Sequence, residues 1–258
     1  MPTIDGVEIH VEGDGAETIV MVHGWPDTYR LWDAQAAFFK SRYRCVRFTL
    51  PGFDIDAPRR ALSVDEMAEF IRQVIERVSP GRPVVLMLHD WGCLFGYQFY
   101  ARHPGLVSRI VGVDVGDTKG MRHSLSLRAR LMMLAYQWWL ALAWRIGGRP
   151  GNAMTLWMKR LLRSPSDERF IGSQMGYPYY LTWFGGAHAY PRHMRRFAPA
   201  CPVLFVYGRR KPLMFHAQAW LDELRRDARN RVVEFDTGHW VMLQQPERFN
   251  QTVSDWLA

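Results

Sequence analysis

The sequence predicts an α/β fold: a mostly parallel β-sheet flanked by helices, with a helical lid inserted before the last two strands. Short runs rich in apolar and β-branched residues alternate with helical patterns, as in α/β proteins. This alternation stops between residues 118 and 199, which have the pattern of helices and loops. That stretch is longer than an ordinary loop. We therefore expect a core formed by residues 1–117 and 200–258, with 118–199 as a lid.

The individual elements follow from local patterns. Residues 63–78, SVDEMAEFIRQVIERV, have the spacing of an amphipathic helix, and Ser63 with Glu66 three residues later is typical of a capping box. The last residues, 246–258, predict a closing helix. Each expected strand is an apolar run that ends at a turn signal. These strands span residues 7–13, 18–24, 43–53, 83–90, 106–116, 202–208 and 231–238.

Composition excludes several classes of protein. The chain has 258 residues, of which three are cysteines, and this small odd number favours a reducing compartment over a disulfide framework. The first residues carry acids where an export signal needs a basic and then an apolar run, so we expect a cytoplasmic protein. The apolar stretch 131–144 is shorter than the roughly 20 residues of a membrane-spanning helix. No metal-ligand or nucleotide-binding motif is present, so no metal or cofactor is expected.

Positive charge is concentrated in one part of the chain. Residues 119–170 contain ten Lys or Arg and two acids, an excess as large as the net charge of +8 of the whole chain. Two interpretations remain open. The segment is either a solvated basic face over a buried apolar one, or a basic, Trp-rich surface that makes weak contact with an anionic membrane. No nucleic-acid-binding module is visible, so charge alone does not predict that partner.

Reactive side chains follow several of the expected strands. They are His23, Asp90, Asp114 or Asp117, and His239. Because open α/β sheets place their sites at the carboxyl ends of strands, we expect these residues to lie close together. Asp90 comes directly after a buried strand and directly before a helical pattern. It is therefore either an N-cap or a reactive carboxylate held at a sharp turn.

These residues resemble the α/β-hydrolase fold, aspartate-nucleophile branch. Residues 88–92, LHDWG, are similar to its nucleophile elbow, although Leu88 replaces the usual small residue. Residues 23–26, HGWP, resemble its oxyanion loop, and residues 237–247, TGHWVMLQQPE, its catalytic-histidine loop. The resemblance covers nearly the whole chain. This branch contains soluble epoxide hydrolases and haloalkane dehalogenases, which share an alkyl-enzyme ester intermediate.

The resemblance implies a role for each matching residue. Asp90 would be the nucleophile, which needs no base because a carboxylate is already ionised near neutral pH. His239 would activate the water that hydrolyses the ester. The backbone N–H groups of Trp25 and Trp91 would form the oxyanion hole. The acid that orients the histidine usually ends a G-x-x-D pattern, but this chain has Gly208-Arg209-Arg210-Lys211 there.

The missing acid leaves two candidates. Some haloalkane dehalogenases carry it after the preceding core strand, which corresponds to Asp114, and Asp117 is the rival. Either would orient His239 and stabilise its imidazolium. The presence of Lys211 at the usual acid position also leaves open a homologue that binds ligand without turnover.

The two chemistries need different helpers. An epoxide oxygen must be protonated as the ring opens, and soluble epoxide hydrolases use two lid tyrosines as acids. The resemblance nominates Tyr136 and Tyr180, with Tyr179 next, although aromatic packing is the alternative. A halide needs only N–H donors, such as the Trp91 indole. Trp25 favours the epoxide hydrolases, because Asn is frequent there in dehalogenases with the Asp114-type acid.

The predicted function is therefore hydrolysis of an epoxide to a vicinal diol, with dehalogenation or ligand binding as alternatives. The expected partner is a small apolar substrate, an epoxide or an alkyl halide. Trp139, Tyr179 and Trp183 are expected to contact it, in a pocket lined by other aromatic and Met side chains of the lid, Trp138 and Trp157 among them. The sequence leaves the choice between monomer and homodimer open.

Overall fold

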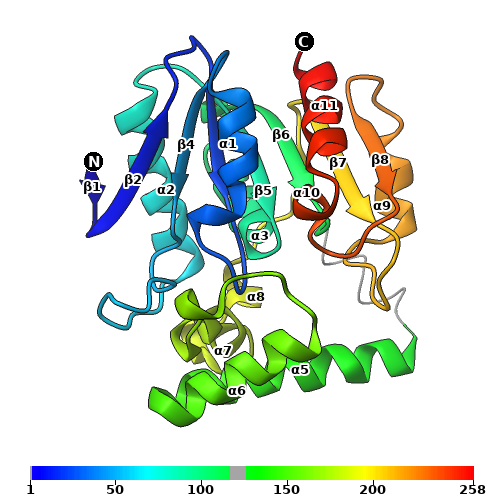
Figure 1. Ribbon diagram of the computed structural model, residues 1–258. Coiled ribbons are helices and arrows are strands. Elements are labelled where there is room, and N and C mark those ends of the chain that lie inside the picture. Colours follow the sequence, from blue (N-terminus) through cyan, green and yellow to red (C-terminus); the bar gives the residue numbers. More distant parts are fainter. Residues whose placement is uncertain (1, 117–125) are drawn as a thin grey trace.

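The computed structural model describes residues 2–116 and 126–258 (Figure 1). Its eight strands form one sheet in the order β1-β2-β4-β3-β5-β6-β7-β8. Strand β1 pairs with β2, and β2 pairs with β4, in the antiparallel direction. The remaining five pairs of neighbouring strands are parallel. This confirms the predicted fold class. The strands are β1 Thr3–Ile4, β2 Val7–Glu12, β3 Thr18–Val22, β4 Arg44–Phe48, β5 Val84–His89, β6 Val107–Val113, β7 Val203–Gly208 and β8 Arg231–Phe235.

Helices cover both faces of the sheet. Along β3, Val20 and Val22 enter one hydrophobic core, whereas Ile19 and Met21 enter the other, because successive strand residues point to opposite faces. The first core is closed by α2 Val64–Val78, α3 Trp91–Tyr100 and α9 Gln218–Leu224. The second is closed by α1 Asp33–Phe39, α10 Val241–Gln244 and α11 Pro246–Leu257. Burial on both faces explains why the central strands are continuous apolar runs.

The start of α2 is confirmed as predicted. The Glu66 N–H donates to Ser63 Oγ, and the Ser63 N–H donates to the Glu66 carboxylate at 2.7 Å. These two bonds satisfy backbone donors that the first helical turn would otherwise leave unpaired.

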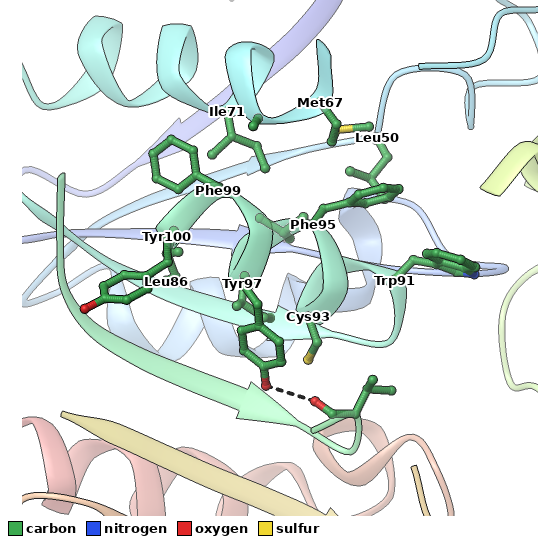
Figure 2. Packing of buried hydrophobic residues seen from close by; sticks show 14 of the residues in the cluster. Leu50, Met67, Ile71, Leu86, Trp91, Cys93, Phe95, Tyr97, Phe99 and Tyr100 are labelled. Atoms are coloured by element: carbon green, nitrogen blue, oxygen red, sulfur yellow. Dashed lines mark hydrogen bonds between the residues drawn. The ribbon is translucent and has the colours of Figure 1, made fainter. Parts of the chain in front are cut away.

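Helix α3 fixes the positions of two strand ends. Figure 2 shows Phe95 and Phe99 on the side of α3 that faces Met67 and Ile71 of α2, and Tyr97 on another side. The Tyr97 hydroxyl donates to the Val115 carbonyl at 2.9 Å. The helix therefore connects the turn after β5 to the segment just after β6.

The turn between β5 and α3 is strained, as the nucleophile elbow requires. Asp90 has φ of 53° there, a left-handed value that non-glycine residues rarely adopt. Gly92 permits the close approach of the helix to β3, because a Cβ on it would overlap the carbonyl of Val22. The unusual Leu88 is accommodated by Gly96, where a Cβ would lie 2.5 Å from the Leu88 Cδ atoms.

Between β6 and β7 the described residues are helical and contain no strand. We call residues 126–193 the helical region. Figure 1 shows it across the end of the sheet at which β6 and β7 terminate. The limits of the predicted lid stay a prediction, and its first residues, up to 125, are outside the described chain. The region contains α5 Leu127–Ile146, α6 Gly148–Leu161, α7 Tyr177–Phe184 and α8 Tyr190–His193.

Five short 3-10 turns complete the described chain. They are η1 Tyr29–Trp32, η2 Pro104–Leu106, η3 Glu168–Phe170, η4 Ser173–Gly176 and η5 Gly186–His188. Of the helices in the described residues, none combines the length and apolar character needed to cross a bilayer.

Candidate active site

The Asp90 carboxylate is held by backbone amides at the end of β5. The Trp25 N–H donates to Asp90 Oδ1 at 2.7 Å, and the Trp91 backbone amide helps to lower the pKa of this carboxylate. Gly24 makes this approach possible, since a Cβ there would overlap Asp90 Oδ1. The two amides are those that the sequence nominated for the oxyanion hole. The Trp25 amide is aimed at an atom on which charge would develop if the carboxyl carbon of Asp90 were attacked.

Asp90 and Asp114 lie on opposite sides of the His239 ring. His239 Nε2 is 3.6 Å from Asp90 Oδ2, and His239 Nδ1 is hydrogen-bonded to Asp114 Oδ2. Asp114 is fully buried and has φ of 71° just after β6. The structure thus brings together the three residues that the sequence nominated as nucleophile, base and orienting acid. The rival acid, Asp117, lies outside the described residues.

Lys211 pairs with the buried acid. Its ammonium forms an ion pair with Asp114 Oδ1 and donates to the Gly208 carbonyl at 3.0 Å. The Gly208 N–H donates to the same Asp114 oxygen at 3.0 Å. Lys211 therefore binds one oxygen of Asp114 and His239 binds the other. Sequence reasoning missed this contact and treated Lys211 only as the sign of a lost acid.

These contacts set the protonation of the site. Burial alone would raise the pKa of Asp114, but the charges of Lys211 and His239 outweigh it and hold that pKa well below its usual range. Burial would lower the pKa of His239, but Asp114 and then Asp90 overcome this and raise it to about 9. The resting site near neutral pH is therefore an imidazolium between two carboxylates.

A cavity opens over Asp90 under the helical region. Asp90, Trp91, Tyr136 and Tyr179 contribute to its lining, together with Gln137 and Thr182. The other lining residues are apolar: Leu94, Val115, Met133, Tyr190, Pro191, Met194 and Phe215. The Tyr136 and Tyr179 rings are 5.9 Å apart, and the Tyr179 ring lies 5.2 Å from the Trp91 ring. Burial and the charge of Asp90 raise the pKa of both tyrosines, so their hydroxyls keep their protons.

Some residues nominated from the sequence lie outside this lining. Tyr180 packs on Trp144 at 4.3 Å between ring centres, whereas Tyr179 is in the cavity lining. Successive residues of a helix point about 100° apart, which separates the two tyrosines. Trp139 donates to the Met154 carbonyl, and Trp183 donates to Gln137 Oε1 at 2.9 Å. Of the three expected substrate contacts, Tyr179 alone is in the cavity lining.

A second buried polar group, which was not expected from the sequence, lies behind His239. Asp27 accepts hydrogen bonds from the Trp240 indole at 3.0 Å and from the Ser166 hydroxyl. Burial raises the pKa of Asp27 to about 6. His89 lies between this carboxylate and His239, with its Nε2 3.2 Å from the His239 carbonyl oxygen. The position of Asp27 directly after the HGWP motif is the signal that could have identified it.

His23, the first strand-end residue, is structural. Its Nε2 accepts from the Leu50 N–H at 2.8 Å, and its Nδ1 donates to the Gly24 carbonyl at 2.9 Å. Burial lowers its pKa to about 4, which keeps the ring neutral. Within residues 2–116 and 126–258, no three His, Cys, Asp or Glu side chains are grouped so as to hold a metal ion.

Comparison with known proteins gives the family. The model of the Alpha/beta hydrolase family matches residues 19–252. The chain therefore belongs to the alpha/beta hydrolase family, and the elbow, oxyanion loop and histidine loop match that assignment. It is structurally similar to an epoxide hydrolase from Bacillus megaterium, with a TM-score of 0.74, 20% identity and 99% of each chain covered. At this identity the likeness shows the fold.

Curated relatives match part of the chain. A probable oxidoreductase, EphD of Mycobacterium tuberculosis, is 38% identical over 112 residues, which are 41% of this chain and 19% of that protein. Epoxide hydrolase 1 of Caenorhabditis elegans is 29% identical over 110 residues, which are 42% of this chain and 27% of that protein. The matches thus span less than a third of either relative. Together the comparisons support a hydrolase similar to epoxide hydrolases.

Proposed function

We propose that the protein hydrolyses an apolar epoxide to a vicinal diol. An Asp90 oxygen attacks one ring carbon, and the bond from that carbon to the epoxide oxygen breaks. The Tyr136 or Tyr179 hydroxyl gives its proton to that oxygen. The product of this step is an alkyl ester on Asp90. The helical region acts as the lid that carries the two tyrosines and excludes water.

Ester formation prepares the second step. It removes the negative charge of Asp90, so the pKa of His239 falls and its proton returns to the tyrosinate. Neutral His239 then takes a proton from water, and the hydroxide attacks the ester carbonyl carbon. The Trp25 and Trp91 amides bind the oxyanion, and Asp114 stabilises the imidazolium. Collapse of the tetrahedral intermediate releases the diol and restores the Asp90 carboxylate. The proton of the hydroxyl group that came from water passes to the departing diol oxygen.

One observation carries this proposal. The Asp90 carboxylate shares a cavity with two tyrosines that keep their protons, and its other side faces His239 at 3.6 Å. Nucleophile, acids and base are therefore within one site. Halide release needs no acid, and the two tyrosines favour ring opening over dehalogenation for this reason. The apolar lining favours an apolar substrate.

Trapping the ester tests the proposal. The His239→Gln variant is incubated with a panel of apolar epoxides and, separately, a panel of haloalkanes, and its intact mass is measured. We expect a mass gain equal to a whole epoxide, because the ester forms and water is not activated. The gain should disappear when Asp90→Asn is added, provided that deamidation of the asparagine is excluded by mass.

Other results would contradict the proposal. An alkyl adduct without halogen, formed only with the haloalkanes, would assign dehalogenation. If neither panel gives an adduct in His239→Gln or turnover in the wild type, the protein is a ligand-binding homologue.

A further inference from the structure

Exposed apolar side chains gather on the helical region. Of thirteen exposed large apolar residues in the described chain, ten lie between Leu127 and Phe184. Nine belong to α5, α6 or the residue that follows α6. We call these nine the outer helical face: Leu127, Leu131, Met132, Trp138, Leu142, Ile146, Trp157, Leu161 and Leu162. Contrary to the sequence expectation, Trp138 and Trp157 therefore lie on the surface, each 52% exposed.

The spacing of these residues along α5 forms a continuous stripe. Leu127, Leu131, Trp138 and Leu142 are four, seven and four residues apart, so they share one side of the helix. The opposite side supplies Met133 and Tyr136 to the cavity, and α5 is consequently apolar on both sides. A helix that is apolar all round is normally covered on all sides. Figure 1 shows α5 and α6 at the outer edge of the molecule, where no other described helix or strand covers them.

The charge on the same helices is of one sign. Between Leu127 and Leu161 there are six Lys or Arg and no acid. Lys159 and Arg160 share Glu168 as an ion-pair partner. In the described part of the chain, Arg145 and Arg149 have no carboxylate within ion-pair distance. Arg145 also lies near Arg59, whose pKa is lowered by burial and then by this neighbouring charge.

We propose that the outer helical face docks onto an anionic lipid surface. Its apolar side chains would enter the boundary between head groups and acyl chains, and the arginines would contact lipid phosphates. Trp138 and Trp157 suit this depth, because an indole has an apolar body and a polar N–H. A second copy of the chain is a poorer partner. A symmetric contact would set the basic face of one copy against that of the other, without acids to pair them.

The test is co-sedimentation of the purified chain with vesicles at low salt. Vesicles of phosphatidylcholine alone are compared with vesicles that also contain phosphatidylglycerol. We expect binding to the anionic vesicles, weaker binding to the neutral ones, and a loss of binding as salt rises. Arg145→Glu/Arg149→Glu should lower the partition coefficient by roughly 30-fold or more, since each basic residue near the surface contributes to binding. Trp138→Ser/Leu142→Ser should also weaken binding.

Matched changes on other surfaces serve as controls. Phe38 is 40% exposed on α1, and Arg82 and Arg226 are exposed outside the helical region. Phe38→Ser and Arg82→Glu/Arg226→Glu should bind anionic vesicles like the wild type. Thermal unfolding of each variant separates loss of binding from loss of fold.

Three results would overturn the proposal. The first is no binding to anionic vesicles at low salt. The second is that the variants of the outer helical face and the control variants weaken binding to the same extent. The third is a dimer in light scattering that Trp138→Ser/Leu142→Ser abolishes, which would assign the face to a second copy. None of these results depends on turnover, so the proposed reaction stands or fails separately.

Discussion

Lys211 binds the Asp114 oxygen that does not contact His239, and its charge bears on how His239 acts as a base. A carboxylate beside the imidazole favours the protonated form, and a nearby ammonium offsets that effect. Lys211 is 6% exposed at its side chain, so the ion pair is poorly screened by solvent. A cation at this position therefore offsets part of the charge of the buried Asp114 carboxylate. By this argument Lys211 should limit how far Asp114 raises the pKa of His239.

Removal of this charge predicts a shifted pH profile. In Lys211→Met the pKa of His239 should rise, because Asp114 is no longer offset. The acidic limb of kcat for ester hydrolysis should then move up by about one pH unit, or about tenfold in rate at neutral pH. The matched control is Arg210→Met, which removes an exposed cation from the same loop. A rate loss that is equal at all pH values would contradict a role through His239.

The two cavity tyrosines give a second prediction at this scale. Tyr136→Phe and Tyr179→Phe should each slow formation of the Asp90 ester. In the double variant the rate of this step should fall by about 10²-fold or more, because the epoxide oxygen then lacks its acid. Tyr180→Phe is the control and should leave the rate unchanged, since Tyr180 lies against Trp144. Single-turnover kinetics with an epoxide measure the step. A larger loss in Tyr180→Phe than in Tyr179→Phe would reverse the assignment.

Individual residues were predictable from the sequence where a strand end fixes them. Asp90, Asp114 and His239 each follow a core strand, and parallel strands bring those ends together. The positions of Tyr179 and Lys211 in the site were harder to predict from the sequence. A loose motif does not resolve a shift of one residue along a helix, which changes the direction of a side chain by about 100°. A lysine at an acid position is ambiguous until its distance to Asp114 is known.

At the scale of elements, the elbow depends on a pair of residues that compensate for each other. Leu88 is larger than the family pattern expects, and Gly96 leaves the space for it. Gly96→Ala should destabilise the fold by about 1–3 kcal/mol through overpacking in the core. In a Leu88→Ala background the same change should cost less, because the Cδ atoms are gone. Urea unfolding of both single variants and the double variant measures this coupling, and additive losses would contradict it.

Elements with a strong pattern were predicted well, and α5 illustrates what patterns leave open. The amphipathic spacing of α2 and its capping residues located its start at Ser63. Helix α5 has apolar residues on all sides, so periodicity does not distinguish the side that lines the cavity from the outer one. The expectation that Trp138 and Trp157 line the pocket was wrong for this reason. The direction of a helix face depends on tertiary packing when it lacks a polar stripe.

For the whole molecule, buried histidines predict how stability changes with pH. Burial lowers the pKa of His23 to about 4, of His89 to about 3 and of His216 to about 4. The unfolded chain therefore binds more protons than the native state below about pH 6.5, and stability should fall as the pH drops from 6.5 towards 4. Each histidine contributes up to about 1.4 kcal/mol per pH unit in this window.

Two other titratable groups, Asp27 and His239, also change how stability depends on pH. Asp27, with its pKa raised to about 6, binds its proton earlier in the native state and opposes the loss between about pH 6 and 4. His239, with its pKa raised to about 9, is protonated in both states below pH 6.5 and adds no slope there. Its own stabilisation is complete below pH 6.5 and is lost as the pH rises through 9. Stability should therefore be greatest near pH 6.5 and fall on both sides.

Urea unfolding at pH 4.5, 5.5, 6.5, 8 and 9.5 measures this profile. His216→Phe should flatten the acid side, because it removes one of the three histidines while an aromatic ring still packs on Phe205 and Tyr207. His239→Gln should flatten the alkaline side alone. The two variants thus separate the histidines kept neutral for the fold from the one kept charged by the site. Stability that stays constant between pH 6.5 and 4.5 would mean that the buried histidines gain protons without unfolding.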